Sequence, residues 1–210
     1  MDKSNNYGAT EQKILDAATK VFLKKGLYGA RTQEIANEAG INKALLHYYF
    51  RNKDKLFQAI FERTFQSFAP LIVQIFNNED PIHDKIKQLV NEYIDFLSAN
   101  PYLPLFLINE IHQNPKRQLP IHQIKGKLKS SRFMQQFEEK VKAGVFVPIK
   151  PEQFITNLLA LIIFPFINKS MLSSVFSMDE TKFDNFIQER KVFVPDMILR
   201  AITIDPKQKV

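Results

Sequence analysis

The stretch RTQEIANEAGINKALLHYYF at residues 31–50 carries two short helical patterns on either side of a glycine. Apolar residues recur at three- and four-residue steps over residues 35–39, and Gly40 can adopt the left-handed conformation that ends a helix. Asn42 is a suitable N-cap for a second helix that reaches about Phe50. Two short helices around such a turn are the layout of a helix-turn-helix, in which the second helix enters the major groove of DNA.

The second helix of this stretch is expected to have two unlike faces. At about 100° per residue, one face gathers the side chains that could touch DNA, namely Lys43, Ala44, His47 and Tyr48. The opposite face gathers Leu45, Leu46 and Tyr49. We expect the apolar face to pack against the rest of the domain, together with Phe50.

Basic residues exceed acidic ones in this chain, and the excess is greatest near the N-terminus. The 210 residues include 29 Lys and Arg against 22 Asp and Glu, which gives a formal net charge of +7. The net positive charge per residue is higher in residues 1–60 than in the remainder. A positive balance favours a polyanionic partner, either nucleic acid or an anionic membrane surface. Its position points to the N-terminal helices as the surface that binds this partner.

Several classes of catalytic site are absent from the sequence. There is no cysteine, so disulfides, thiolate metal sites and cysteine nucleophiles are excluded. The four histidines have no metal-binding spacing, no G-x-S-x-G motif occurs, and the six glycines form no phosphate-binding loop. We therefore expect that the protein is not an enzyme and has neither a cofactor nor a bound metal.

The apolar segments are too short to suggest a membrane protein. The longest apolar run, residues 158–167, is about half of what a spanning helix needs, and it contains Pro165. The first residues have no apolar stretch that could act as a signal peptide. We expect a cytoplasmic protein without a membrane partner.

Helical periodicity continues through the chain, and no segment alternates with the two-residue period of a half-buried strand. The predicted fold class is therefore all-α, with an N-terminal helix-turn-helix domain at residues 8–54 and a larger helical domain at residues 55–205. Outside the helix-turn-helix, helices are expected at about residues 10–25, 53–77, 119–142, 151–176 and 179–202. Two more are expected to begin at Pro81 and Pro101, because each proline follows a capping residue, Asp80 or Asn100. Thr32 is expected to cap the first helix of the motif, and Pro70 to kink or end the long helix.

The N-terminal part of the chain resembles the TetR family. The resemblance rests on the pattern T-x-x-x-I-A-x-x-A-G at Thr32–Gly40 and on KALLHYYFRNKDKLF at Lys43–Phe57, after a long first helix. It covers about residues 11–59, and the chain departs from the family pattern at Asn42, Ala44 and His47. The resemblance implies a transcriptional repressor that binds a palindromic double-stranded DNA operator as a homodimer and is released by a small-molecule inducer.

The resemblance also assigns roles to individual side chains. It implies that Thr32, Tyr48 and Lys53 hold DNA phosphates. It places Gln33, Asn42, Lys43, Ala44 and His47 at or near base edges, and Arg31 belongs to the same predicted DNA-binding surface. A hydroxyl beside the free backbone N–H groups of a helix start suits a phosphate, which supports the role of Thr32. The alternatives are that Thr32 only caps a helix, that Lys53 is a solvated lysine, and that His47 packs against Lys43.

Phenylalanine is concentrated in the larger domain, because only Phe22 and Phe50 of the 19 phenylalanines precede residue 57. Such side chains can line a cavity for an apolar or aromatic inducer, although ordinary core packing is the alternative. The predicted ligand-binding residues are Phe96, Phe106, Asn109, Glu110, His112, Phe133, Phe137 and Phe164.

The last two long helices are predicted to form a subunit interface. The segment at residues 154–167 is apolar on nearly all sides, and a helix of this kind must be buried on all sides. A second subunit offers one of those sides, and TetR-like proteins pair through two C-terminal helices. The predicted interface residues are Phe154, Leu158, Leu159, Ile162, Phe166, Phe186, Val194 and Ile198.

A different class of function is also compatible with the charge. A basic helical module could bind membrane surfaces or proteins without reading a DNA sequence. That alternative predicts equal binding to anionic vesicles and to any duplex.

Overall fold

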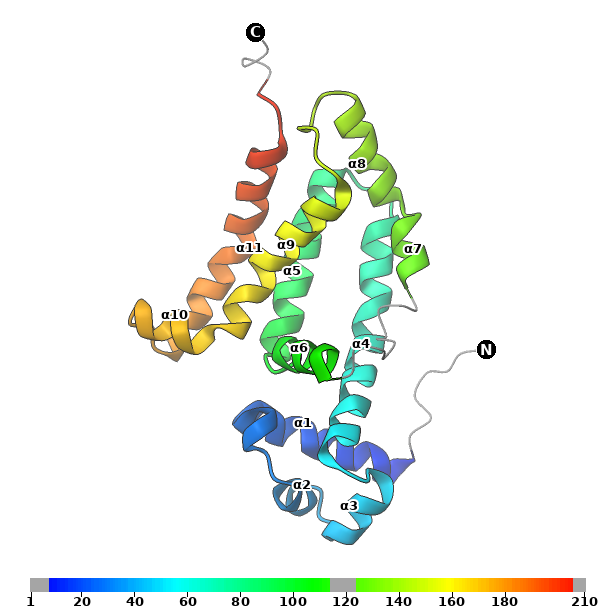
Figure 1. The fold of residues 1–210 in the computed structure, drawn as a ribbon, viewed down its shortest axis with the longest axis vertical. Coiled ribbons are helices and arrows are strands. Elements are labelled where there is room, and N and C mark those ends of the chain that lie inside the picture. Colours follow the sequence, from blue (N-terminus) through cyan, green and yellow to red (C-terminus); the bar gives the residue numbers. More distant parts are fainter. Residues whose placement is uncertain (1–7, 114–123, 206–210) are drawn as a thin grey trace. The chain divides into compact units, whose positions relative to one another are not determined.

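The computed structural model describes residues 8–113 and 124–205, which fold almost entirely into α-helices (Figure 1). Within these ranges there is no β-strand, and one isolated bridge pairs Phe146 with Thr203. The all-α prediction is therefore confirmed. The helices are α1 (Ala9–Gly29), α2 (Thr32–Glu38), α3 (Lys43–Tyr49), α4 (Lys53–Asn77), α5 (Ile82–Ala99), α6 (Leu103–Gln113), α7 (Lys125–Lys129), α8 (Arg132–Lys142), α9 (Pro151–Ile167), α10 (Lys169–Val175) and α11 (Glu180–Ile202).

The described residues form two compact units. The first unit contains the chain up to Phe68 and the segment that begins at Asn100, which includes α6. The second contains Ala69–Ala99 and α7 to α11. The unit that holds the helix-turn-helix thus continues beyond residue 54 into the first part of α4. The domain boundary between residues 54 and 55 stays a prediction.

The core of the first unit joins α1 to α4 through aromatic rings. Phe22 of α1 and Phe57 of α4 are buried, and their ring centroids are 4.9 Å apart. Tyr102 packs edge-on against Phe57 at 5.5 Å. At the edge of this core, the guanidinium of Arg63 binds the Asp16 carboxylate at 2.8 Å. Helix α4 is therefore fixed to α1 by both apolar and polar contacts.

The core of the second unit is a cluster of phenylalanines. Phe133 and Phe137 of α8 are fully buried. The ring of Phe76 lies 4.7 Å from that of Phe133, and the ring of Phe154 lies 4.8 Å from that of Phe137. Phe146 completes the cluster at 5.5 Å from Phe137. Centroid separations of this size show that the aromatic rings are in direct contact.

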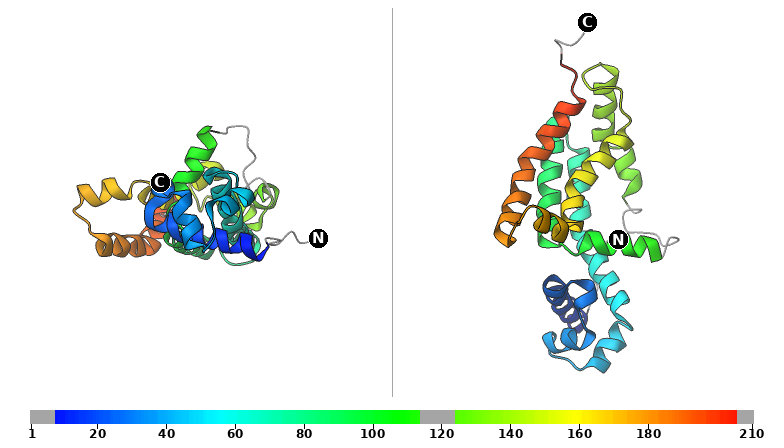
Figure 2. Two further views of the ribbon diagram at one scale, coloured as in Figure 1. Left: turned by 90° about the horizontal axis from the view of Figure 1, so that it is seen from below. Right: turned by 60° about the vertical axis from the view of Figure 1, so that its left-hand side comes forward.

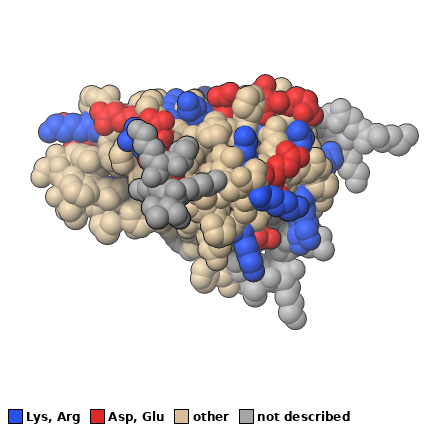
Figure 3. Space-filling view, turned by 90° about the horizontal axis from the view of Figure 1, so that it is seen from above, with Lys and Arg blue, Asp and Glu red and all other residues tan. Residues whose placement is uncertain are grey.

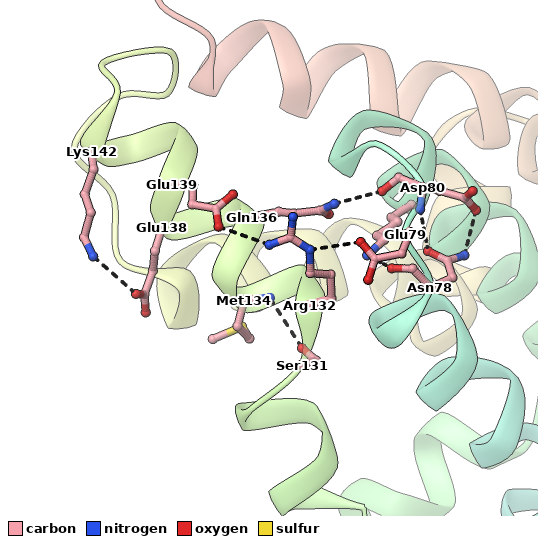
Figure 4. A network of polar contacts seen from close by, with 11 residues as sticks. Asn78, Glu79, Asp80, Ser131, Arg132, Met134, Gln136, Glu138, Glu139 and Lys142 are labelled. Atoms are coloured by element: carbon pink, nitrogen blue, oxygen red, sulfur yellow. Dashed lines mark hydrogen bonds and ion pairs between the residues drawn. The ribbon is translucent and has the colours of Figure 1, made fainter.

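Polar contacts hold α8 to the turn between α4 and α5 (Figure 4). Arg132 binds the Glu79 carboxylate at 3.2 Å and the Glu139 carboxylate at 3.0 Å. Gln136 donates to the main-chain carbonyl of Asp80 at 3.1 Å. Lys85, in the first turn of α5, is fully buried and donates to the carbonyl of Asn78 at 2.6 Å. The ammonium thereby satisfies a carbonyl just beyond the end of α4.

Two predicted helix boundaries are wrong. Helix α1 continues through Gly26 to Gly29. The predicted bounds of the long helix are confirmed by α4, with Pro70 inside it, and a kink at Pro70 stays a prediction. The described part of the helix expected at residues 119–142 is divided into α7 and α8. The hydroxyl of Ser131 accepts from the N–H of Met134 at 3.4 Å, and this N-cap begins α8 afresh.

The helix expected at residues 151–176 is also divided. Helix α9 ends at Ile167 and α10 begins at Lys169, with a bend of 75° between them. In the described part of the chain, no single helix combines the length and apolar composition needed to cross a membrane, and only this bent pair reaches them when the two helices are taken together.

Candidate nucleic-acid interface

Helix α3 has one buried and one exposed face, as its periodicity predicts. Leu46 is fully buried and Phe50, at the end of the helix, is 5% exposed. The side chains on the opposite face are exposed: Lys43, Ala44, His47 and Tyr48. Tyr49 departs from the expectation, because its ring is 37% exposed and packs edge-on against Tyr48 at 5.4 Å.

The ends of α3 are fixed by local hydrogen bonds. Gly40 has a φ of 63°, the left-handed conformation that lets the chain leave α2 and turn. The side chain of Asn42 then accepts from the N–H of Leu45 at 2.7 Å. This N-cap confirms the predicted start of the helix. Asn52 caps the N-terminus of α4: its side chain accepts from the N–H of Lys55 at 2.8 Å.

The structure corrects the cap of α2. Arg31, not Thr32, is the N-cap: its backbone is extended, and its N–H donates to the Glu34 carboxylate at 3.4 Å. Thr32 is the first residue of the helix and is half-buried. Threonine was expected at the cap because its hydroxyl is a common capping group. The helix instead begins one residue earlier, and the Glu34 carboxylate accepts from the N–H of the cap residue itself. The predicted phosphate contact of Thr32 stays a prediction.

Ion pairs join α1 to α2. The ammonium of Lys25 lies 2.8 Å from the Glu34 carboxylate, and this hydrogen bond is the main reason that the pKa of Glu34 is lowered. Lys20 pairs with Glu38 at 3.4 Å. Both pairs are partly exposed, so each contributes little to stability.

Two further predicted DNA-binding residues have specific neighbours. The ammonium of Lys53 donates to the main-chain carbonyl of Ala30 at 3.3 Å, which brings it beside the start of α2. Gln33 lies on the exposed side of α2 and donates to the Asn37 side chain at 3.0 Å. The structure thus brings Arg31, Thr32 and Lys53 into one region, with Gln33 one residue further along α2.

One residue of this surface was missed by the sequence analysis. The carbonyl oxygen of Arg51 lies 3.0 Å from the Nδ1 atom of His47. The spacing of four residues could have suggested this contact, but Arg51 follows the end of α3, where helical geometry no longer applies. The packing alternative for His47 pairs it with Lys43, whereas the contact that the structure shows is with the Arg51 main chain.

The predicted ligand-binding residues do not form one described cavity. Phe133 and Phe137 are fully buried in the phenylalanine cluster, and Phe96 packs edge-on against Tyr93 at 6.4 Å. Phe164 is 49% exposed on α9, and His112 is exposed on α6. The side chains of Phe106, Asn109 and Glu110 lie outside the described residues. The ligand-binding role of this set stays a prediction.

Most predicted interface residues face the core of their own chain. The buried ones are Phe154, Leu158, Ile162, Val194 and Ile198, whereas Leu159, Phe166 and Phe186 are half-buried. Helices α9 and α11 lie side by side in the second unit (Figure 2), and α5 packs against both. Periodicity identified the apolar face correctly, because these five residues are buried within their own chain. The subunit-interface role of the set stays a prediction.

The outer side of α9 and α11 is apolar as well. Val192 and Phe193 of α11 are 67% and 58% exposed, and Met197 is 37% exposed. Together with Phe164 of α9, these four residues define the outer face discussed below. Two shallow grooves of about 680 and 510 Å³ run along it, and the side chain of Arg190 lines both.

Comparison with known proteins agrees with this geometry. Residues 14–60 match the family described as bacterial regulatory proteins, tetR family. The "Probable HTH-type transcriptional regulator YttP" of Bacillus subtilis is 22% identical over 191 residues, which cover 89% of this chain and 92% of that protein. The "HTH-type transcriptional repressor NicS" of Pseudomonas putida is 33% identical over 106 residues, which cover 50% of each protein.

Solved structures have the same fold. A TetR transcription regulator from Haloarcula marismortui superposes with a TM-score of 0.62 at 20% identity, covering 94% of this chain and 100% of that one. The hemolysin II transcriptional regulator HlyIIR superposes with a TM-score of 0.56 at 23% identity, covering 93% and 98%. The relatives are transcriptional regulators and not enzymes, as expected for this chain. Residues 14–60 are therefore a DNA-binding domain of the tetR family of bacterial regulatory proteins, in a chain that is similar along most of its length to transcriptional regulators.

Proposed function

We propose that this regulator is a repressor that binds a palindromic operator as a homodimer and leaves it when a small apolar molecule binds. The observation that carries the proposal is the exposed face of α3. Lys43, His47 and Tyr48 project from a helix whose other side is anchored by Leu46 and Phe50. A helix held in this way can place side chains against base edges with little loss of conformational freedom.

Phosphate contacts would set the position of α3 in the groove. Lys53 and Thr32 lie at the starts of α4 and α2, and the Lys53 ammonium is held near the α2 start by the Ala30 carbonyl. Contacts of this kind fix orientation and supply affinity, whereas base contacts supply specificity. The proposal therefore divides the surface into a phosphate-binding part on α2 and α4 and a base-reading part on α3.

The outer face of α9 and α11 supports pairing with a second copy. Val192, Phe193, Met197 and Phe164 expose large apolar side chains on adjacent helices. Ala160 and Ala201 line the groove between them, and small residues let a second helix approach closely. Apolar side chains gathered in this way mark an interaction site in soluble proteins. A two-fold dimer would also supply the two recognition helices that a palindromic operator requires.

Neither the face drawn in Figure 3 nor helix α3 has the charge pattern of a membrane-surface module. On the face drawn in Figure 3, Lys and Arg side chains are interspersed with Asp and Glu. A surface that binds anionic lipids would gather basic groups on one side of an amphipathic helix. Helix α3 instead combines one cationic side chain with aromatic and imidazole groups, a composition suited to base edges.

The repressor role draws on the relatives, because NicS is named as a repressor. The inducer is proposed to bind in the second unit, where aromatic side chains are concentrated. Helix α4 is continuous from the DNA-binding unit into the second unit, so a ligand that changes how α4 packs there would act on the position of α3.

A reporter experiment in cells tests this function. Random duplexes bound by the protein are selected, and the preferred sequence is placed between a promoter and a reporter gene. Expression of the wild-type chain should lower reporter output, and Lys43→Ala should restore it. Raised output would contradict the repressor role while leaving DNA recognition intact. If the protein occupies the operator but reporter output does not change, the protein does not control transcription from this site.

A further inference from the structure

The ring of His47 is held by a main-chain acceptor. Its Nδ1 atom lies 3.0 Å from the carbonyl oxygen of Arg51, and the ring is exposed on the face of α3 that also carries Lys43. A carbonyl oxygen only accepts hydrogen bonds. The nitrogen that faces it must therefore donate, and the Nδ1 atom of His47 carries a proton.

This contact decides what the other ring nitrogen can do. A neutral imidazole has one N–H group, so a proton on Nδ1 leaves Nε2 as a bare acceptor. In the major groove, the only hydrogen-bond donors on the bases are the amino groups of adenine and cytosine. We propose that His47 recognises a base through its Nε2 atom, which accepts from the N6 amino group of adenine or the N4 amino group of cytosine.

The Arg51 carbonyl is well placed to hold the ring because residues on both sides of it are fixed. Phe50 is buried and its N–H donates to the Leu46 carbonyl at 2.8 Å. Asn52 caps α4 through Lys55, and its carbonyl accepts from the N–H of Leu56 at 3.2 Å. The exposed side chain of Arg51 is not needed for this arrangement. Arg51→Ala therefore leaves the carbonyl in place and serves as a control.

The same geometry argues against other partners for His47. Phosphate oxygens, and the N7 and O6 atoms of guanine, are acceptors and cannot bind a bare nitrogen. Lys43 lies one helical turn earlier on the same face and can only donate. The two residues therefore have complementary roles: Lys43 suits guanine or a phosphate, whereas His47 suits an exocyclic amino group. This inference rests on the proposed DNA recognition by α3.

The experiment removes one amino group at a time from the DNA. In the selected operator, each adenine of a half-site is replaced by purine and each cytosine by 2-pyrimidinone, which lack the amino group. Loss of one such group should weaken binding by wild type about 2- to 12-fold, the equivalent of one hydrogen bond. His47→Phe keeps a planar ring but has no hydrogen-bond acceptor in place of Nε2. It should bind the intact operator more weakly and be insensitive to that same base replacement.

Arg51→Ala should remain as sensitive as wild type to the base replacement.

A second measurement is independent of affinity: ¹⁵N spectra of the full chain should show a protonated Nδ1 and an unprotonated Nε2 in His47, both free and bound to DNA. A proton on Nε2 in the complex would overturn the inference. A second result would also overturn it: the contribution of His47 to affinity is lost when a phosphate is replaced by methylphosphonate, but not when any base amino group is removed.

These measurements distinguish a wrong role for His47 from a wrong proposed function. If wild type prefers a sequence but wild type and His47→Phe respond alike to every base replacement, the role of His47 is wrong and the proposed function stands. If wild type binds all duplexes equally, both are wrong, whatever the tautomer of the ring.

Discussion

Arg190 of α11 donates from Nη2 to the main-chain carbonyl of Leu161 in α9, at 2.6 Å. In a regular helix this carbonyl would accept from the N–H of residue 165, but that residue is Pro165, which has none. Arg190 thus supplies the donor that the proline removes. Burial lowers the pKa of the guanidinium, and its Nε atom is buried without a hydrogen-bond partner in the described structure.

The first prediction concerns this contact. Arg190→Met should lower the free energy of unfolding by about 1–3 kcal/mol, because it leaves the Leu161 carbonyl without a donor. Pro165→Ala restores an N–H inside α9, so the loss caused by Arg190→Met should be smaller in the Pro165→Ala background. Urea denaturation of the four proteins at one protein concentration measures the coupling. Equal losses in both backgrounds would show that Arg190 does not compensate for the proline.

The second prediction separates the outer and inner faces of α11. Val192 and Phe193 are exposed, so Phe193→Asp should convert the proposed dimer to a folded monomer. Ile198 is 5% exposed, so Ile198→Asp should destabilise the fold itself, because a charge would be buried within one chain. Gln188→Asp, at an exposed position of the same helix, is the control and should remain dimeric. Sedimentation together with circular dichroism distinguishes these outcomes. A wild-type protein that is monomeric at micromolar concentration would rule out the proposed homodimer.

The third prediction distinguishes phosphate contacts from base contacts. Lys53→Ala should weaken binding to all duplexes alike and reduce the slope of log affinity against log salt by about one. Lys43→Ala should relax preference at a few base pairs, by about 1–3 kcal/mol. Titrations at several salt concentrations with selected and scrambled duplexes measure both. The assignment fails if the two variants change affinity and salt dependence in the same way.

The fourth prediction concerns the inducer. An apolar or aromatic compound that binds the second unit should weaken operator binding, with a coupling free energy of about 1–3 kcal/mol. Linkage requires that the operator weaken ligand binding by the same factor. Candidate compounds are therefore titrated by calorimetry with and without operator DNA. A compound that binds in the second unit with the same affinity in both cases would show that this site is not coupled to DNA.

Local sequence signals predicted much of the DNA-binding unit. The cap at Asn42, the turn at Gly40 and the buried Leu46 all depend on neighbouring residues, and all three were expected from the pattern. The family resemblance came from the same segment, whereas the all-α class followed from helical periodicity along the whole chain. The same local signals failed at the start of α2, where they predicted Thr32 as the N-cap and the structure has Arg31.

Contacts between distant segments could not be predicted in this way. A periodic pattern shows that Leu158 and Ile162 lie on an apolar face, but not whether that face is covered by the same chain or by another. A high content of phenylalanine likewise does not distinguish cavity walls from a packed cluster such as Phe133 and Phe137. The pairing of Arg190 with Leu161 depends on how α11 lies against α9, which no local pattern specifies.

The most direct test of DNA recognition by α3 is a competition measurement. The full chain is bound to a labelled operator obtained by selection, and unlabelled competitors are added at physiological salt: the same operator, a scrambled duplex of equal length and composition, and anionic vesicles. The operator should compete at least about 10³-fold better than the scrambled duplex, as sequence-specific DNA-binding proteins do. Equal competition by the operator and the scrambled duplex would contradict the assignment of α3 as a recognition helix.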